Sequence, residues 1–217
     1  MNKTALVIFA REPKDGKVKT RLCGDMPSAV VTRLYKAFMR DVIAIARKAK
    51  CDQRFLYYSS SDPSIPFVWS FRDRFQLRRQ AGSVLGDRMH QAFVDCSKNG
   101  FGKIVIVGTD CLMLTADDIK MAFHELDKCD CVLGPTKDGG YYLIGLNSPD
   151  AGLFRRIQWG TSSVLQQTVD RITGMKKTFS LLDQKEDIDT PEDLKRLSRA
   201  IKGTNMAVHT QKVLETI

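Results

Sequence analysis

The chain opens with a nearly continuous apolar run, TALVIFA at residues 4–10, which leads directly into a charged loop. Such a run is typical of a central strand of a parallel sheet, because helices cover both faces of that sheet and exclude water from it. Apolar residues then recur at intervals of three and four from Val31 to Ala49, with charged residues between them. This spacing indicates a long amphipathic helix. The first unit is therefore strand, loop and helix.

The same alternation continues along the chain. Further strands are predicted at residues 54–59, 76–79, 103–107, 131–134, 141–146 and 178–182, and further helices at residues 85–96, from about 115, at 163–172 and at 191–201. Thr115 and Thr190 can each cap a helix, since acidic residues follow both of them. We predict an α/β fold, a Rossmann-like α/β/α sandwich with a mixed, mainly parallel sheet, in which the run after the Asp138-Gly139-Gly140 turn is antiparallel or sharply bent.

The length of 217 residues fits one domain with a core of its own. We expect this single domain to span residues 1–203. Residues 204–217 then form a C-terminal tail, which is either loose or a docking helix.

Composition and charge narrow the class of protein. The net charge of +9 invites a nucleic-acid function, but the basic residues are spread along the chain without interleaved aromatic residues. We therefore expect a solvated basic surface and no nucleic-acid partner. The first apolar run is too short for the core of a signal peptide, so we expect a cytoplasmic protein without a membrane span.

The loop after the first strand concentrates positive charge. Arg11, Lys14, Lys19 and Arg21 lie close together around Gly16. Guanidinium and ammonium groups bind phosphate oxygens, and glycine lets backbone amides approach them. The spacing matches neither a Walker loop nor a dinucleotide-binding glycine motif. We expect this loop to bind a polyphosphate, chiefly through Lys19 and Arg21, the alternative being a solvated basic loop.

Asp110 follows the strand KIVIV, at the edge where parallel α/β sheets bind ligands. Mg²⁺ and Mn²⁺ prefer oxygen ligands and are commonly shared between carboxylates and substrate phosphates. Asp110 is thus a candidate metal ligand, or an ordinary turn residue. A second ligand could come from Asp187 or Asp189, which the helix cap at Thr190 leaves free.

Two glycine-containing segments are weaker candidates for substrate contacts. The turn at Asp138 could accept a flat group such as a base or sugar ring, although a simple hairpin turn explains it nearly as well. The segment from Gln80 to Arg88 forms a second glycine-rich entrance. The residues expected to contact substrate are Ala10, Arg11, Lys14, Gly16, Gln80, Gly82, Arg88, Thr109, Asp138, Gly139, Gly140 and Tyr141.

Six segments taken together carry a resemblance to a known family. They are FAREPKDGKVKTRL, QAGSVLGDRMHQAF, VIVGTDCLML, GPTKDGGYYLIGL, WGTSSVL and DIDTPEDL. In this order they resemble a bacterial family of nucleotide-diphospho-sugar transferases over residues 3–200. The resemblance implies the GT-A fold.

The resemblance also assigns metal ligands. It implies that Asp110 stands at the position of the metal-binding acidic motif. It also implies that Asp189 supplies a further ligand to Mg²⁺ or Mn²⁺. The chain departs from the family at Leu112-Met113, where members usually have proline and then an acidic or polar residue. It also lacks the second acid of a glycosyltransferase D-x-D motif.

Three functions remain open. The first is transfer of a sugar from a nucleotide-diphospho-sugar to a small-molecule acceptor that the sequence does not name, with Asp110, Lys19 and Arg21 carrying the chemistry. The second is nucleotidyl transfer from a triphosphate with release of pyrophosphate, because the basic loop is similar to that of sugar-phosphate and phospholactate nucleotidyltransferases. The third is a nucleotide-binding protein that has lost catalysis, which the altered Leu112-Met113 motivates.

Overall fold

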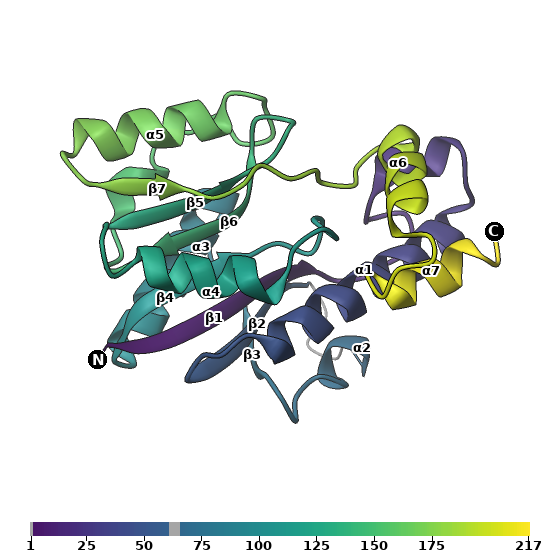
Figure 1. The fold of residues 1–217 in the computed structure, drawn as a ribbon, viewed down its shortest axis with the longest axis horizontal. Helices are drawn as coiled ribbons and strands as arrows, with labels where there is room; N and C mark the ends of the chain where they lie inside the picture. The colour runs from purple at the N-terminus through teal and green to yellow at the C-terminus, as the bar shows by residue number, and fades with distance from the viewer. Residues whose placement is uncertain (1, 61–65) are drawn as a thin grey trace.

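A computed structural model describes residues 2–60 and 66–217 of the chain. These residues form one sheet with the strand order β3-β2-β1-β4-β6-β5-β7 (Figure 1). The strands are β1 (Lys3–Arg11), β2 (Gln53–Ser59), β3 (Gln76–Arg79), β4 (Phe101–Val107), β5 (Cys131–Pro135), β6 (Tyr141–Leu146) and β7 (Phe179–Leu181).

Helices connect most of these strands. The α-helices are α1 (Ser28–Lys48), α2 (Pro66–Trp69), α3 (Leu85–Lys98), α4 (Ala116–Glu125), α5 (Val164–Gly174), α6 (Pro191–Ile201) and α7 (Val208–Leu214), and the short 3-10 helices are η1 (Thr20–Gly24) and η2 (Ala151–Phe154). In the described part of the chain, none of the helices has the length and apolar character that crossing a bilayer would require.

The pairing confirms the predicted mixed, mainly parallel sheet. β1 pairs in parallel with β2 and β4, and β2 in parallel with β3. β6 is antiparallel to both of its neighbours, β4 and β5, while β7 is parallel to β5. The parallel strands therefore end at one edge of the sheet, on the side where α6 lies in Figure 1, and the β5–β6 turn lies at that same edge.

Helices cover both faces of the sheet, and the side chains that alternate along β1 pack against helices on the two sides. Leu6 and Ile8 pack in a core with α1 and α4, whereas Val7 and Phe9 pack in a second core with α3. α5 completes the second layer through Ile172. Each large apolar side chain removed from water in these cores contributes about 1.5–3 kcal/mol. The predicted α/β/α sandwich is thus the observed architecture.

The two predicted helix caps are present. The Thr115 hydroxyl accepts a hydrogen bond from the Asp118 amide, and the Asp118 carboxylate accepts one from the Thr115 amide. Thr190 and Asp193 form the same reciprocal pair at the start of α6. The second cap also holds the segment just before α6 in place.

The C-terminal segment contains a helix that packs on α1. Buried Asp41 of α1 accepts hydrogen bonds from the amides of His209 and Thr210, at 2.9 and 2.8 Å, and from the Thr210 hydroxyl at 2.6 Å. Of the two alternatives for residues 204–217, the structure has the docking helix. The end of the single domain at residue 203 stays a prediction.

We expect Asp41→Ala to lower the free energy of unfolding by roughly 2–4 kcal/mol, because buried donors of α7 lose a charged acceptor. Urea denaturation measures this change, and hydrogen exchange at residues 208–214 shows whether α7 detaches. The matched control is Asp73→Ala, since the Asp73 side chain is 85% exposed. Equal stability of the two variants would contradict the role given to Asp41.

Candidate substrate and metal site

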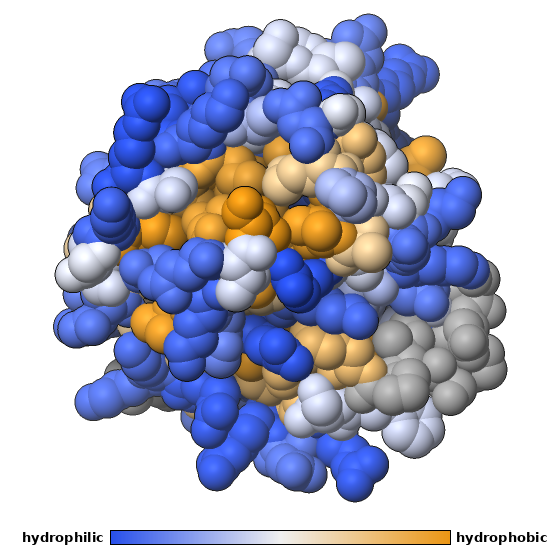
Figure 2. Space-filling model, turned by 90° about the vertical axis from the view of Figure 1, so that its right-hand side faces the viewer, coloured by the Kyte–Doolittle hydropathy of each residue, from blue (hydrophilic) through white to orange (hydrophobic). Residues whose placement is uncertain are grey.

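A cavity of about 600 Å³ lies at the edge where the parallel strands end. Residues of β1, β4 and β6 line it together with η1, the start of α3 and the segment before α6. Figure 2, which views the molecule from this side, shows apolar surface in a recess ringed by hydrophilic residues. The cavity is therefore the meeting point of segments that are far apart in the sequence.

The apolar wall of the cavity continues the core beneath α3. Phe9, Ile106 and Ile144 line the cavity and belong to that core. Leu85 and Met89 of α3 extend this wall, and Leu85 is 45% exposed. An apolar wall beside a charged one suits a ligand with both a flat ring and an anionic group.

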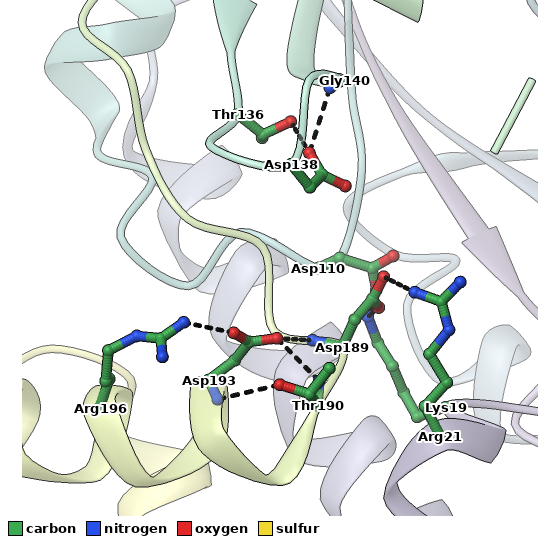
Figure 3. Close-up of polar contacts among 10 residues, drawn as sticks. All are labelled: Lys19, Arg21, Asp110, Thr136, Asp138, Gly140, Asp189, Thr190, Asp193 and Arg196. Atoms are coloured by element: carbon green, nitrogen blue, oxygen red, sulfur yellow. Dashed lines mark hydrogen bonds and ion pairs between the residues drawn. The ribbon is translucent and has the colours of Figure 1, made fainter. Parts of the chain in front are cut away.

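The charged wall is centred on one lysine. The Lys19 ammonium lies 2.8 Å from Asp110 Oδ1 and 2.7 Å from Asp189 Oδ1, and its side chain is only 5% exposed (Figure 3). Arg21 lies farther out, with a nitrogen 3.8 Å from Asp189 Oδ2. A single buried cation thus holds two carboxylates that come from separate segments.

Local structure brings these groups together. Lys19 has φ 47° and ψ 44°, a left-handed conformation that costs a residue with a side chain about 1–2 kcal/mol. The Ile188 amide donates to the Asp110 carbonyl at 3.0 Å, which pairs the segment before α6 with the end of β4. Asp193 accepts a hydrogen bond from the Asp189 amide at 3.0 Å and fixes the backbone there. The strained backbone of Lys19 is therefore compensated by contacts within the site.

The protonation of Lys19 follows from these contacts. Burial alone would lower the pKa of Lys19, but the charges and hydrogen bonds of Asp110 and Asp189 raise it above its ordinary value. Tyr35 of α1 also lines the cavity: its hydroxyl accepts from the Arg11 amide at 2.9 Å and lies 3.0 Å from the Thr109 hydroxyl. Burial, and next the charge of Asp110, raise the pKa of Tyr35, so it stays neutral.

Asp187 is a third carboxyl group in the cavity lining. Its Oδ1 is buried and has no hydrogen-bond partner among the described residues. Burial, and then the charge of Asp110, raise the pKa of Asp187 to about 8. A buried carboxylate needs a partner for its charge, and Oδ1 of Asp187 has none among the described residues. The neutral, protonated form of Asp187 is therefore favoured.

The β5–β6 turn is held rigidly near the site. Asp138 Oδ1 accepts hydrogen bonds from the Thr136 hydroxyl at 2.5 Å and the Gly140 amide at 3.1 Å (Figure 3). Gly139 has φ +87°, and a Cβ there would lie 1.9 Å from the Ser162 carbonyl oxygen, so only glycine fits. Gly139 therefore serves close packing against the loop before α5.

The cavity collects most of the residues predicted to bind substrate or metal. Those that line it are Ala10, Arg11, Lys19, Arg21, Gln80, Arg88, Thr109, Asp110, Tyr141 and Asp189. Those outside its lining are Lys14, Gly16, Gly82, Asp138, Gly139 and Gly140. Lys14 and Gly16 are exposed on the basic loop, and the Gly82 carbonyl accepts a hydrogen bond from Arg88 at 3.1 Å.

Sequence reasoning missed several lining residues. Tyr35 and Met89 lie on the inner faces of helices, where their spacing indicates only core packing. The signal for Tyr35 was a hydroxyl on an otherwise apolar helix face, since a buried tyrosine hydroxyl needs a partner. Asp187 was considered beside Asp189, but nothing in the sequence indicated that it is the more buried of the two.

The residues present fit a divalent cation that a substrate helps to hold. No group of three or more His, Cys, Asp or Glu side chains in residues 2–60 and 66–217 is arranged as a ready metal site. Asp110 and Asp189 already share one cation, and Asp187 beside them has an orphaned oxygen. Mg²⁺ and Mn²⁺ are commonly held by one or two carboxylates together with substrate phosphates. Leu112 takes no part, because it is buried in the core.

The raised pKa of Asp187 predicts a pH effect on stability. Between about pH 4 and pH 8 the native state keeps a proton that the unfolded chain releases, so stability falls as pH rises, by at most about 1.4 kcal/mol per pH unit. Asp187→Asn cannot ionise and should lose less stability over this window. Urea denaturation at about pH 5 and pH 8.5 in EDTA measures the difference. Asp73→Asn is the exposed control, and parallel pH profiles of wild type and Asp187→Asn would refute the assignment.

Comparison with known proteins places this fold among transferases. A protein of Desulfovibrio desulfuricans G20 named "putative nucleotide-diphospho-sugar transferase" superposes with a TM-score of 0.90 and 28% identity, over 100% of this chain and 95% of that one. The inositol-1-phosphate CTP transferase of T. maritima gives a TM-score of 0.60 at 14% identity, over 94% and 98% of the two chains. Rv0371C of Mycobacterium tuberculosis H37Rv, solved in complex with manganese, gives 0.52 at 15% identity, over 91% and 98%.

The low identity of the last two shows a shared fold alone. No curated protein matches the sequence. The profile of a family described as uncharacterized proteins conserved in bacteria (DUF2064) matches residues 42–161. Since this match covers more than half of the chain, the protein belongs to that family.

Proposed function

We propose that the protein transfers a sugar from a nucleotide-diphospho-sugar donor bound in the cavity at the sheet edge, with Mg²⁺ or Mn²⁺. The observation that carries this proposal is the convergence of Lys19, Asp110 and Asp189 in one cavity, with the Lys19 ammonium within 2.8 Å of both carboxylates. A buried cation beside two carboxylates, facing an apolar wall, suits an anionic leaving group joined to a nucleoside.

The side chains divide the work between binding and stabilising charge. Arg11 and Arg21 line the cavity, and their guanidinium groups would bind the donor's phosphate oxygens. The apolar wall at Phe9 and Leu85 would pack against the flat base and exclude water from it. Asp110 and Asp189 would hold the metal ion, which when bound would neutralise the charge that develops on the departing diphosphate.

The comparisons support a nucleotide-diphospho-sugar donor but do not identify its base or its sugar. The protein of Desulfovibrio desulfuricans that carries the nucleotide-diphospho-sugar transferase name matches over the full length of this chain. The manganese complex of Rv0371C is consistent with a metal in this fold, although its identity of 15% carries the fold alone.

Nucleotidyl transfer is the second candidate, and one observation favours it. Lys19 joins Asp110 to Asp189, which comes from a segment far along the chain and not from the loop of Asp110. The position where a D-x-D motif would place its second acid is Leu112, which is 1% exposed. The leucine at this position departs from the glycosyltransferase D-x-D motif, so this arrangement favours an ion held on a triphosphate.

A thermal-shift panel separates the two candidates. Nucleoside triphosphates, nucleoside diphosphates and nucleotide sugars are each tested with and without Mg²⁺ or Mn²⁺, because a ligand at about 100 times its Kd stabilises the fold by about 2.7 kcal/mol. We expect the largest metal-dependent shift with one nucleotide sugar. A larger shift with a triphosphate would favour nucleotidyl transfer, and pyrophosphate release would then confirm it. Absence of any shift would oppose both and favour a protein that has lost the site.

Asp110→Asn tests the metal-binding role on turnover. We expect at least about a hundredfold loss of transfer, because a ligand to the charge-stabilising ion is removed while the shape of the side chain is kept. Product formation with the nucleotide sugar chosen by the panel is the measurement. Asp117→Asn, an exposed change on α4, is the control and should retain activity. Full activity of Asp110→Asn, with or without metal, would exclude this mechanism.

A further inference from the structure

The Lys19 ammonium occupies the place between Asp110 and Asp189 where a divalent cation would bind. Its distances of 2.8 and 2.7 Å are to one oxygen of each carboxylate, and only 5% of its side chain is exposed. The carboxylates themselves are 43% and 40% exposed. The cation is thus more deeply buried than the anions that hold it.

We propose that Lys19 is a resident counter-ion of the metal site and moves to the substrate's diphosphate when a metal ion binds. This inference rests on the proposed function for the identity of the ion and the diphosphate. It goes beyond that function by giving Lys19 two successive partners. The lysine holds the carboxylates together before binding, and contacts phosphate after it.

Charge and space make the two cations exclusive. Mg²⁺ or Mn²⁺ binds carboxylate oxygens at about 2.0–2.2 Å, closer than the ammonium does. An ion bound to Asp110 Oδ1 and Asp189 Oδ1 would therefore overlap the present position of the ammonium. The ammonium must leave those oxygens, and leaving is unfavourable unless another anion receives it.

The structure supplies a route for that movement. Lys19 precedes η1 on the basic loop and lines the cavity between Val18 and Thr20. Val18 is 2% exposed and anchors the loop backbone. The long side chain of Lys19 can therefore change its conformation while the loop stays in place. A diphosphate beside Arg21 would lie on the same wall of the cavity. A change of side-chain conformation would then bring the Lys19 ammonium to the diphosphate.

The consequence is coupling between the two ligands. A free metal ion must displace Lys19 without compensation and should bind weakly, whereas an ion that arrives with a diphosphate gives the ammonium a new partner. Coupling of this kind is reciprocal. Removing the ammonium should strengthen the binding of the metal alone and weaken the binding of the diphosphate.

The test is a titration of the metal-free full chain with Mn²⁺ alone, by isothermal calorimetry, for wild type and two variants. Lys19→Met removes the charge and keeps the length, and Lys19→Gln keeps a hydrogen-bond donor in case Lys19→Met fails to fold. We expect either variant to bind Mn²⁺ at least about tenfold more tightly than wild type, since about 1.4 kcal/mol corresponds to a tenfold change. Mn²⁺ should also raise the melting temperature of the variant more than that of wild type.

Lys17→Met is the matched control, because Lys17 lies on the same loop but is exposed. It removes the same charge from the surface, so it measures the general electrostatic effect and should change Mn²⁺ affinity less than about twofold. Equal Mn²⁺ affinities of wild type and the Lys19 variants would overturn the proposal. So would an equal gain in Lys17→Met.

Inorganic pyrophosphate, titrated into protein saturated with Mn²⁺, tests the second partner of Lys19. We expect the Lys19 variants to bind it at least about fivefold more weakly than wild type, because a charged donor to phosphate is lost. Unchanged pyrophosphate affinity would overturn this half of the proposal. These are binding measurements, so an absence of transfer activity would refute the proposed function while leaving the exchange at Lys19 supported.

Discussion

The site depends on one ammonium group shared by two carboxylates. Lys19, Asp110 and Asp189 come from the first loop, the middle and the last third of the chain, and the ion pairs among them close the charged wall of the cavity. Without the lysine, the two carboxylates would repel each other at the end of β4. The left-handed backbone of Lys19 shows that local conformational preference is overridden to make this contact.

The topology of the sheet is the second constraint. Parallel strands separated by helices end at the same edge, so the loops after β1 and β4 meet there without any sequence signal that specifies the meeting. The segment before α6 joins them through backbone contacts, since Ile188 pairs with Asp110, and Lys185 pairs with Pro135 and Lys137. The site is thus held by main-chain pairing as well as by charge.

Much of the fold could be predicted from the sequence, because it rests on local patterns. Burial on both faces of β1, the amphipathic helices and the capping residues Thr115 and Thr190 are each encoded within a few neighbouring residues. The loops that carry Lys19 and Asp110 could also be predicted, as ends of buried strands. The pairing of Lys19 with both carboxylates could not, because it joins residues far apart in the chain. The burial of Asp187 and the inward position of Tyr35 likewise depend on packing between elements.

The antiparallel β6 has a consequence for how such a site can diversify. Because β6 begins at the binding edge, Tyr141, Tyr142, Leu143 and Ile144 present one wall of the cavity from within a strand, where hydrogen bonds to β4 and β5 fix the backbone. Other parts of the lining come from the basic loop and the start of α3, which follow loops and tolerate insertion and substitution far better. Proteins with this fold can therefore change the ligand that they accept by substitutions in the basic loop and at the start of α3, while the part of the lining within β6 stays nearly the same.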